Sequence, residues 1–102
     1  MSELNLKMSL KTKLADISLF KKIVSNGLLE ERKKIEYALN KTNGNIKKWE
    51  TKYKLSSEKF IQRFQKNEIE ENSDTFEWWA ELKALKELEE KLNIVNNIEI
   101  CQ

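Results

Sequence analysis

Five acidic side chains close together in the sequence are the strongest candidates for a metal site or a catalytic carboxylate pair. They are Glu68, Glu70, Glu71, Asp74 and Glu77. Their spacing does not match the twelve-residue calcium-binding loop, and the segment has no glycine for the sharp turn of that loop. We therefore expect a solvated loop followed by a helix cap, and no metal site.

Other residues that catalysis or cofactor binding would need are missing. The chain has no histidine, so it lacks the usual acid or base at neutral pH, Ser/Cys–His nucleophile pairs and imidazole metal ligands. Gly27 and Gly44 stand alone and cannot form a phosphate-binding loop. Cys101, the only cysteine, has no basic neighbour to activate it. We expect no enzymatic activity and no cofactor.

Aromatic residues carry the more informative chemistry. Seven lie within 31 residues: Trp49, Tyr53, Phe60, Phe64, Phe76, Trp78 and Trp79. Aromatic side chains supply much of the binding energy in cores and in interface hot spots. On a helix the adjacent Trp78 and Trp79 would point about 100° apart, so one ring can face the core while the other anchors a partner. The alternative is that both rings fill the core.

The composition predicts the elements that must position these rings. Half of the 102 residues are Ala, Glu, Lys, Leu or Arg, and there is no proline. This predicts a single all-α domain of long helices or coiled coil. Charge is divided unevenly, with a net +7 over residues 1–54 and −5 over residues 55–102. The first half is suited to phosphate, and the second half to a basic protein surface.

Residues 1–27 are predicted to hold a short strand and a helix. Alternation of apolar with polar residues indicates a strand with one apolar face, formed by Leu4, Leu6, Met8 and Leu10. Its partner would be residues 98–100 or the same strand of a second subunit. Asp16 can cap the helix, and Asn26-Gly27 is expected to end it.

A long basic helix is predicted over residues 28–54. Steps of four and three residues define a heptad-like apolar stripe at Ile35, Leu39, Thr42, Ile46, Trp49 and Tyr53. Four weak helix formers interrupt it at residues 42–45. Because the stripe passes through them without a phase shift, we favour a continuous or kinked helix over a hairpin turn.

An aromatic, acidic helical hairpin is predicted over residues 55–95. Ser56 is a natural N-cap for its short first helix. Asp74, followed three residues later by Glu77, is expected to cap the second helix. The apolar face of that second helix comprises Trp78, Leu82, Leu85, Leu88 and Leu92. Asn96-Asn97 is expected to end it and to leave residues 96–102 as a tail.

Three motifs between residues 50 and 80 carry a family resemblance. They are Glu50-Thr51-Lys52-Tyr53-Lys54-Leu55-Ser56-Ser57-Glu58-Lys59-Phe60, Arg63-Phe64 and Asp74-Thr75-Phe76-Glu77-Trp78-Trp79-Ala80. Over residues 28–95 the chain resembles small helical proteins of archaea and cyanobacteria that are regarded as antitoxin-like partners of small toxins, many of them ribonucleases. In that family Gly-Met usually stands where this chain has Lys54-Leu55, and a Gly-Glu pair often stands at Lys66-Asn67-Glu68.

The resemblance implies a non-enzymatic antitoxin. Ribonucleases tend to be basic because they bind RNA, so an acidic, aromatic half would fit such a toxin. No apolar run approaches the roughly 18 residues of a membrane span, and a lone cysteine excludes an intrachain disulfide, so we expect a cytoplasmic protein. The expected partner-binding residues are Phe60, Phe64, Glu70, Glu71, Asp74, Phe76, Trp78 and Trp79.

Two alternatives use other parts of the chain. A strand, a helix, an Asn-Gly turn and a second helix is the order of a ribbon-helix-helix repressor, which lays paired strands in the major groove of DNA. The DNA-binding residues would then be Asn5, Lys7, Ser9, Lys11 and Lys13. The other alternative is a coiled-coil homodimer with a structural role.

Overall fold

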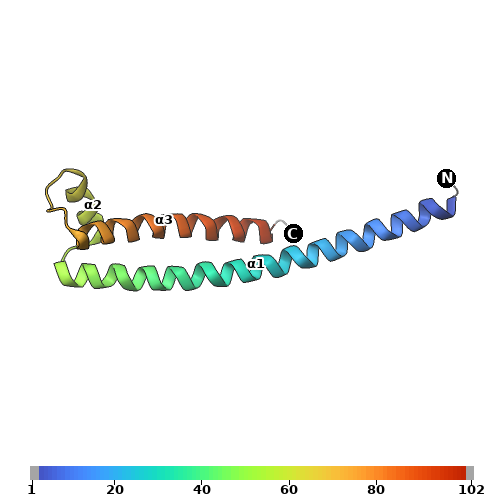
Figure 1. Cartoon of the computed structure of the whole chain (residues 1–102), viewed down its shortest axis with the longest axis horizontal. Coiled ribbons are helices and arrows are strands. Elements are labelled where there is room, and N and C mark those ends of the chain that lie inside the picture. Colours follow the sequence, from blue (N-terminus) through green and yellow to red (C-terminus); the bar gives the residue numbers. More distant parts are fainter. Residues whose placement is uncertain (1–2, 101–102) are drawn as a thin grey trace.

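A computed structural model describes residues 3–100 of the chain, with side chains described from residue 13 to residue 99. Within this range the chain forms three helices, α1 (Glu3–Tyr53), α2 (Ser57–Gln65) and α3 (Ser73–Ile100). The helices α1 and α3 pack antiparallel, and α2 lies at the end of the pair where the chain turns back (Figure 1). The predicted all-α class is confirmed, although the main helix pair is α1 with α3.

The molecule is long and narrow, with principal extents of 76 × 22 × 22 Å. Arg32 of α1 donates hydrogen bonds to the Asn96 amide oxygen and the Glu99 carboxylate of α3. Residue 32 therefore lies opposite the last turns of α3. The N-terminal part of α1 extends past the end of α3 (Figure 1).

The predicted division of residues 1–27 is wrong for the residues that the structure describes. Leu4–Leu10 belong to α1, and so do Asn26 and Gly27, which were expected to end a helix. An unpaired strand would leave its backbone groups without protein partners, whereas a helix satisfies them within the segment. A single helical glycine costs only about 1 kcal/mol relative to alanine, which is too little to end a helix with good formers on both sides.

The long helix over residues 28–54 is confirmed, and it is continuous through residues 42–45. Its stripe packs against α3, with Ile35, Thr42 and Ile46 buried. Burial of this stripe outweighs the weak helix propensity of the Asn-Gly segment, since packing supplies most helix stability in proteins.

The ends of α1 and α2 share one geometry. Lys54 and Asn67 have positive φ angles of 49° and 58°. The Leu55 N–H donates to the Glu50 carbonyl at 3.2 Å, and the Glu68 N–H donates to the Arg63 carbonyl at 2.9 Å. These bonds define Schellman motifs, in which the left-handed residue is usually glycine. Lys54 and Asn67 occupy this left-handed position.

Side-chain caps start the two later helices. The Ser56 hydroxyl accepts the Lys59 N–H at 3.3 Å, which confirms the predicted cap of α2. Asn72, rather than Asp74, caps α3, because its side-chain oxygen accepts the Thr75 N–H at 3.0 Å. In return the Asn72 N–H donates to the Thr75 hydroxyl oxygen at 2.9 Å. This reciprocal pair is the capping-box arrangement with threonine in the place of glutamate.

The C-terminal end of α3 also differs from its prediction. The helix continues through Asn96-Asn97 to Ile100, so residues 96–100 are not a tail. Arg32 of α1 bonds to Asn96 and Glu99. The neighbouring residue Val95 is buried. These contacts stabilise the last turns of α3 and outweigh the tendency of asparagine to end a helix.

The tightest packing is at the corner where the three helices meet. The Phe60 ring of α2 and the Trp78 ring of α3 stack with centroids 3.9 Å apart and planes 7° from parallel. The Tyr53 ring of α1 also stacks on Trp78, with centroids 5.9 Å apart and planes 26° from parallel. The Trp78 indole N–H donates to the Ser57 hydroxyl at 3.1 Å, so its polar atom is satisfied.

Replacement of Trp78 by alanine is expected to lower the free energy of unfolding by about 3–5 kcal/mol, because it leaves a cavity that three helices line. Urea unfolding followed by circular dichroism measures the change. Tyr37→Ala is the matched control, since Tyr37 is 73% exposed on α1, and its expected change is within about 0.5 kcal/mol. A Trp78→Ala loss as small as that of the control would contradict a packed corner.

Replacement of Lys54 by glycine is expected to stabilise the protein by about 1 kcal/mol, because glycine adopts the left-handed conformation without the steric penalty of a Cβ atom. The same substitution at Lys41, an exposed position inside α1, is expected to destabilise it by about 1 kcal/mol. The midpoints of urea unfolding compare the two variants. Equal signs for both substitutions would contradict the assigned geometry of Lys54.

Candidate protein-binding site

Two of the residues expected to bind a partner lie in the core instead. Phe60 and Trp78 are 0% and 1% exposed, and their rings stack on each other. Neither ring is available to a partner in this structure, which corrects their assignment to the binding surface. Of the adjacent tryptophans, Trp78 faces the core, whereas Trp79 remains partly exposed. This agrees with the interpretation that only one of the two rings fills the core.

Three other aromatic side chains form a cluster on the outside of the corner. Phe64 of α2 lies 6.0 Å from Phe76 in an edge-to-face arrangement and 6.2 Å from Trp79, measured between ring centroids. Phe76 and Trp79 are three residues apart on α3 and therefore share a face. Phe76 is 50% exposed, while Phe64 and Trp79 are half-buried. We call Phe64, Phe76 and Trp79 the aromatic cluster.

The inner core holds the aromatic cluster in place. Phe64 is also 5.3 Å from Phe60, which is stacked on Trp78. The cluster therefore rests on a buried aromatic layer and on two capped helix starts. Side chains supported in this way lose little conformational entropy when they bind a partner.

A cation already lies on the aromatic cluster. The Lys83 ammonium is 4.2 Å from the Trp79 ring centroid, within the range of a cation–π interaction. Sequence reasoning missed Lys83, although its i, i+4 spacing from Trp79 on a helix is a signal for such a contact. The contact shows that the exposed ring face can accept a positively charged group.

Acidic residues lie between the members of the aromatic cluster in the sequence. Glu70 and Glu71 are exposed in the segment between α2 and α3, as expected for a solvated loop. Residues 57–83, which include both helix starts and this segment, contain seven acidic and four basic side chains. This stretch of the chain therefore has a net charge of −3, which favours a basic partner.

Asp74 is engaged within the protein. Its carboxylate accepts hydrogen bonds from the Lys52 ammonium and from the Tyr53 hydroxyl, both at 2.7 Å. The hydrogen bonds from Lys52 and Tyr53 lower the pKa of Asp74 below its ordinary value. The bond to Asp74 in turn raises the pKa values of Lys52 and Tyr53. Asp74 thus joins the end of α1 to the start of α3 and is only partly free to steer a partner.

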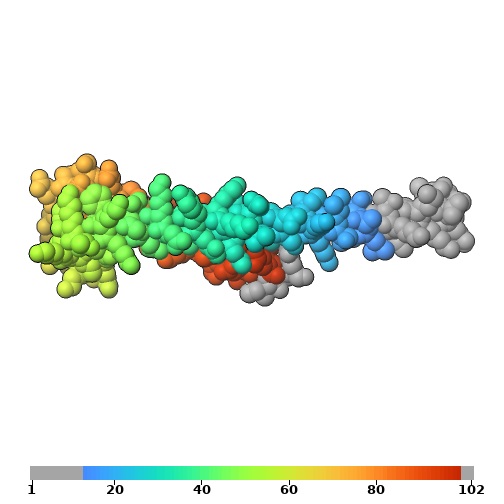
Figure 2. Space-filling model, turned by 90° about the horizontal axis from the view of Figure 1, so that it is seen from below, coloured from blue at the N-terminus to red at the C-terminus, as the bar shows by residue number. Residues whose placement is uncertain are grey.

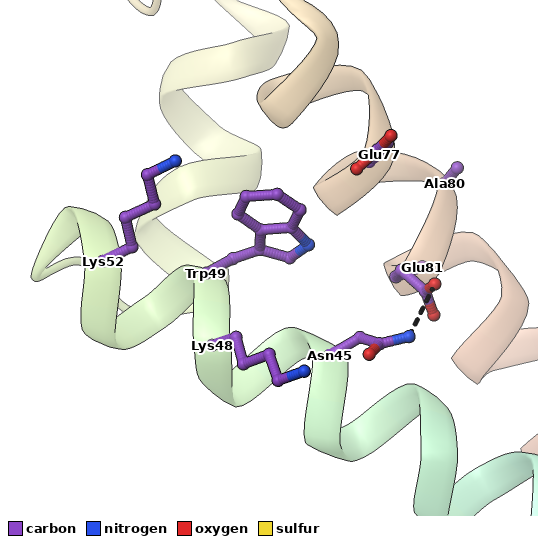
Figure 3. Close-up of a pocket in the computed structure, with 7 residues that line it drawn as sticks. All are labelled: Asn45, Lys48, Trp49, Lys52, Glu77, Ala80 and Glu81. Atoms are coloured by element: carbon purple, nitrogen blue, oxygen red, sulfur yellow. Dashed lines mark hydrogen bonds between the residues drawn. The ribbon is translucent and has the colours of Figure 1, made fainter.

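An open groove of about 510 Å³ lies between α1 and α3 next to this corner. Figure 3 shows the Trp49 ring between the two helices, with Lys48 and Lys52 on α1 and Glu77 and Glu81 on α3. Asn45 crosses the groove to donate to the Glu81 carboxylate at 3.1 Å. Because bases line one wall and acids the other, the groove has no preference for one sign of charge.

The alternative DNA-binding arrangement lacks its central element. Asn5, Lys7, Ser9, Lys11 and Lys13 all lie in α1, and the structure has no strand among residues 3–100. Paired strands cannot then enter a major groove as a ribbon-helix-helix repressor requires. The side chain of Lys13 is exposed, and the side chains of the other four lie outside the described set.

Within the described residues, no group of three or more Cys, Asp or Glu side chains is arranged to hold a metal ion. None of the three helices there has an apolar stretch long enough to cross a bilayer.

Comparison with known proteins gives no match, since no family model, no curated protein and no solved structure is significantly similar to this chain. Its function must therefore be argued from its own residues.

The pH dependence of stability is expected to reveal the contacts of Asp74. A lowered pKa means that the Asp74 contribution is present above pH 4 and is lost as the pH falls through its folded-state pKa. The raised pKa values of Lys52 and Tyr53 mean that the contribution is lost again as the pH rises above about 10. The stability difference between wild type and Asp74→Asn should therefore be largest between about pH 5 and pH 9.

Urea unfolding at a series of pH values measures this difference. Glu71→Gln, which changes an exposed carboxylate of the same region, is the control and should unfold like wild type at neutral pH. An Asp74→Asn effect of constant size from acid to alkaline pH would contradict the assigned hydrogen bonds.

Proposed function

We propose that this chain is a non-enzymatic cytoplasmic protein that binds a basic protein through its aromatic cluster, and that it acts as the antitoxin of a toxin–antitoxin pair. The observation that carries the proposal is the partly exposed cluster of Phe64, Phe76 and Trp79 on a tightly packed corner. Tryptophan and other aromatic side chains are enriched in interface cores and hot spots.

The charge around the aromatic cluster supports a basic partner. Glu70 and Glu71 are exposed in the segment between the two helices that carry it, and opposite charges increase the rate at which two proteins meet. The Trp79 ring offers a second element of recognition, because an arginine of the partner can replace Lys83 on its face. The aromatic contacts would then determine how slowly the complex dissociates.

The antitoxin role is the specific form that the family resemblance suggests. A small ribonuclease has a basic surface for RNA, and a protein with aromatic anchors and an acidic margin would cover it. The chain would need no catalytic group for this task, since occlusion of the toxin surface is sufficient.

Co-expression with the product of the adjacent gene tests the proposal. Size-exclusion chromatography with light scattering should give a complex for wild type, while Phe76→Ala/Trp79→Ala should bind about 30-fold more weakly or worse, as loss of a hot spot of about 2 kcal/mol implies. Circular dichroism of the variant should remain that of a helical protein. Tyr37→Ala, which removes an exposed ring on α1 far from the cluster, should bind like wild type.

Two results would contradict the proposal in different ways. Wild-type affinity in the double variant would show that the aromatic cluster is not the contact. Absence of any complex with wild type, or a complex that leaves the activity of the neighbouring protein unchanged, would contradict the antitoxin role.

A further inference from the structure

The N-terminal part of α1 carries large apolar side chains that remain exposed in the described structure. Leu14, Ile17 and Phe20 are each more than half exposed, and Phe20 reaches 66%. Figure 2 shows this segment, in blue, clear of the red end of α3. We call residues 13–28 the extension.

The extension continues the same face of α1 that packs on α3. An α-helix completes five turns in 18 residues. Ile17, Val24 and Leu28 stand 18 residues before the buried residues of α1 that face α3, which are Ile35, Thr42 and Ile46. The apolar face of the extension therefore continues the face of α1 that packs on α3, and a second helix could pack on it in the same way.

A helix of this kind needs a partner. Isolated helices are marginally stable in water, and most helices in proteins are stabilised by packing of their apolar face. The Asn26-Gly27 pair further weakens this segment. A second helix along the extension would supply the packing that α3 supplies to the rest of α1.

We propose that the partner is the extension of a second copy of this chain, packed antiparallel about a two-fold axis at the level of residue 19. This axis places Phe20, the most exposed apolar side chain of the segment, close to its own copy. It also places Leu14 of each chain opposite Val24 of the other. The apolar stripe of the extension is therefore complementary to itself when one helix is reversed.

The charges of the extension favour the antiparallel direction. Asp16 is its only acidic residue, and Lys21 and Lys22 lie beyond Phe20. Reversal of one helix about residue 19 brings Lys21, which lies within about 45° of the stripe, to the level of Ile17 of the other copy. A parallel pair in register would instead bring like charges together, which is unfavourable.

The contact is short, which sets the expected affinity. Sixteen residues of helix span about 24 Å, so the interface falls at the small end of specific protein contacts, and a dissociation constant on the order of 10 µM is expected. The extension carries a net charge of +2. Added salt should therefore strengthen the dimer by screening repulsion, whereas docking of an acidic foreign partner would weaken with salt.

Sedimentation equilibrium and light scattering of the full chain test the proposal. Between about 1 and about 200 µM protein, the mass should rise from 12.1 kDa towards about twice that value. Ile17→Lys/Phe20→Lys should remain a monomer throughout. Leu19→Lys is the matched control, because Leu19 is also exposed, at 57%, but points about 155° away from the stripe on a helix; it should dimerise like wild type.

Cysteine cross-linking tests the direction of packing. In a Cys101→Ser background, oxidation of a mixture of the Leu14→Cys and Val24→Cys chains should give the mixed dimer, because an antiparallel pair brings these two positions together. Each chain alone should cross-link poorly. Efficient cross-linking of each chain with itself would overturn the antiparallel arrangement.

A wild-type chain that stays monomeric at the highest concentration would overturn the proposal, and so would a dimer that survives Ile17→Lys/Phe20→Lys. Neither result bears on the aromatic cluster, which lies at the opposite end of α1 and is tested with other residues.

Discussion

The stack of Phe60 on Trp78 is the contact on which the rest of the fold depends. It joins α2 to α3, and Tyr53 extends it to the end of α1. Two Schellman motifs and two side-chain caps turn the chain at this corner, but each of these local devices contributes only about 1 kcal/mol. The buried aromatic layer makes the turns cooperative, because all three helices must be in place for the two rings to be fully buried.

Polar contacts at both ends of the helix pair define how α3 lies along α1. Asp74 binds Lys52 and Tyr53 near the corner, and Arg32 binds Asn96 and Glu99 near the other end. Exposed ion pairs contribute little to stability. Their role here is to fix the register of α3 along α1. The apolar side chains between the two helices would tolerate a shift of α3 by one turn, but such a shift would separate the polar partners at both ends.

The sequence predicted the parts of the fold in which local pattern and packing agree. The stripe from Ile35 to Tyr53 and the Ser56 cap were predictable because periodicity and capping act over a few residues. The N-terminal strand was wrong because an alternating pattern of only seven residues, 4–10, does not distinguish a strand from one end of a long helix. The extent of α3 beyond Asn96 was not predictable, since it depends on Arg32, which is 64 residues away in the chain.

The candidate site was also predictable only where it depends on residues close together in the sequence. An aromatic-rich, acidic segment could be recognised from composition, and Trp78 and Trp79 could be placed on different faces of one helix. Which ring would be buried depended on where α2 packs, so Phe60 and Trp78 were assigned to the wrong surface. Asp74 looked like a free acid or a cap because its partners belong to α1, more than 20 residues earlier.

The different surroundings of two consecutive residues have a spectroscopic consequence. Trp78 is shielded from water, with its ring against Phe60 and its N–H bonded to Ser57, so its fluorescence should be blue-shifted and should report on the integrity of the corner. Trp79 is partly in contact with solvent and carries the Lys83 ammonium on its ring, so its emission should respond to occupation of the outer surface. With Trp49 replaced, the chain would carry separate optical reporters of folding and of surface contact at adjacent positions of one helix.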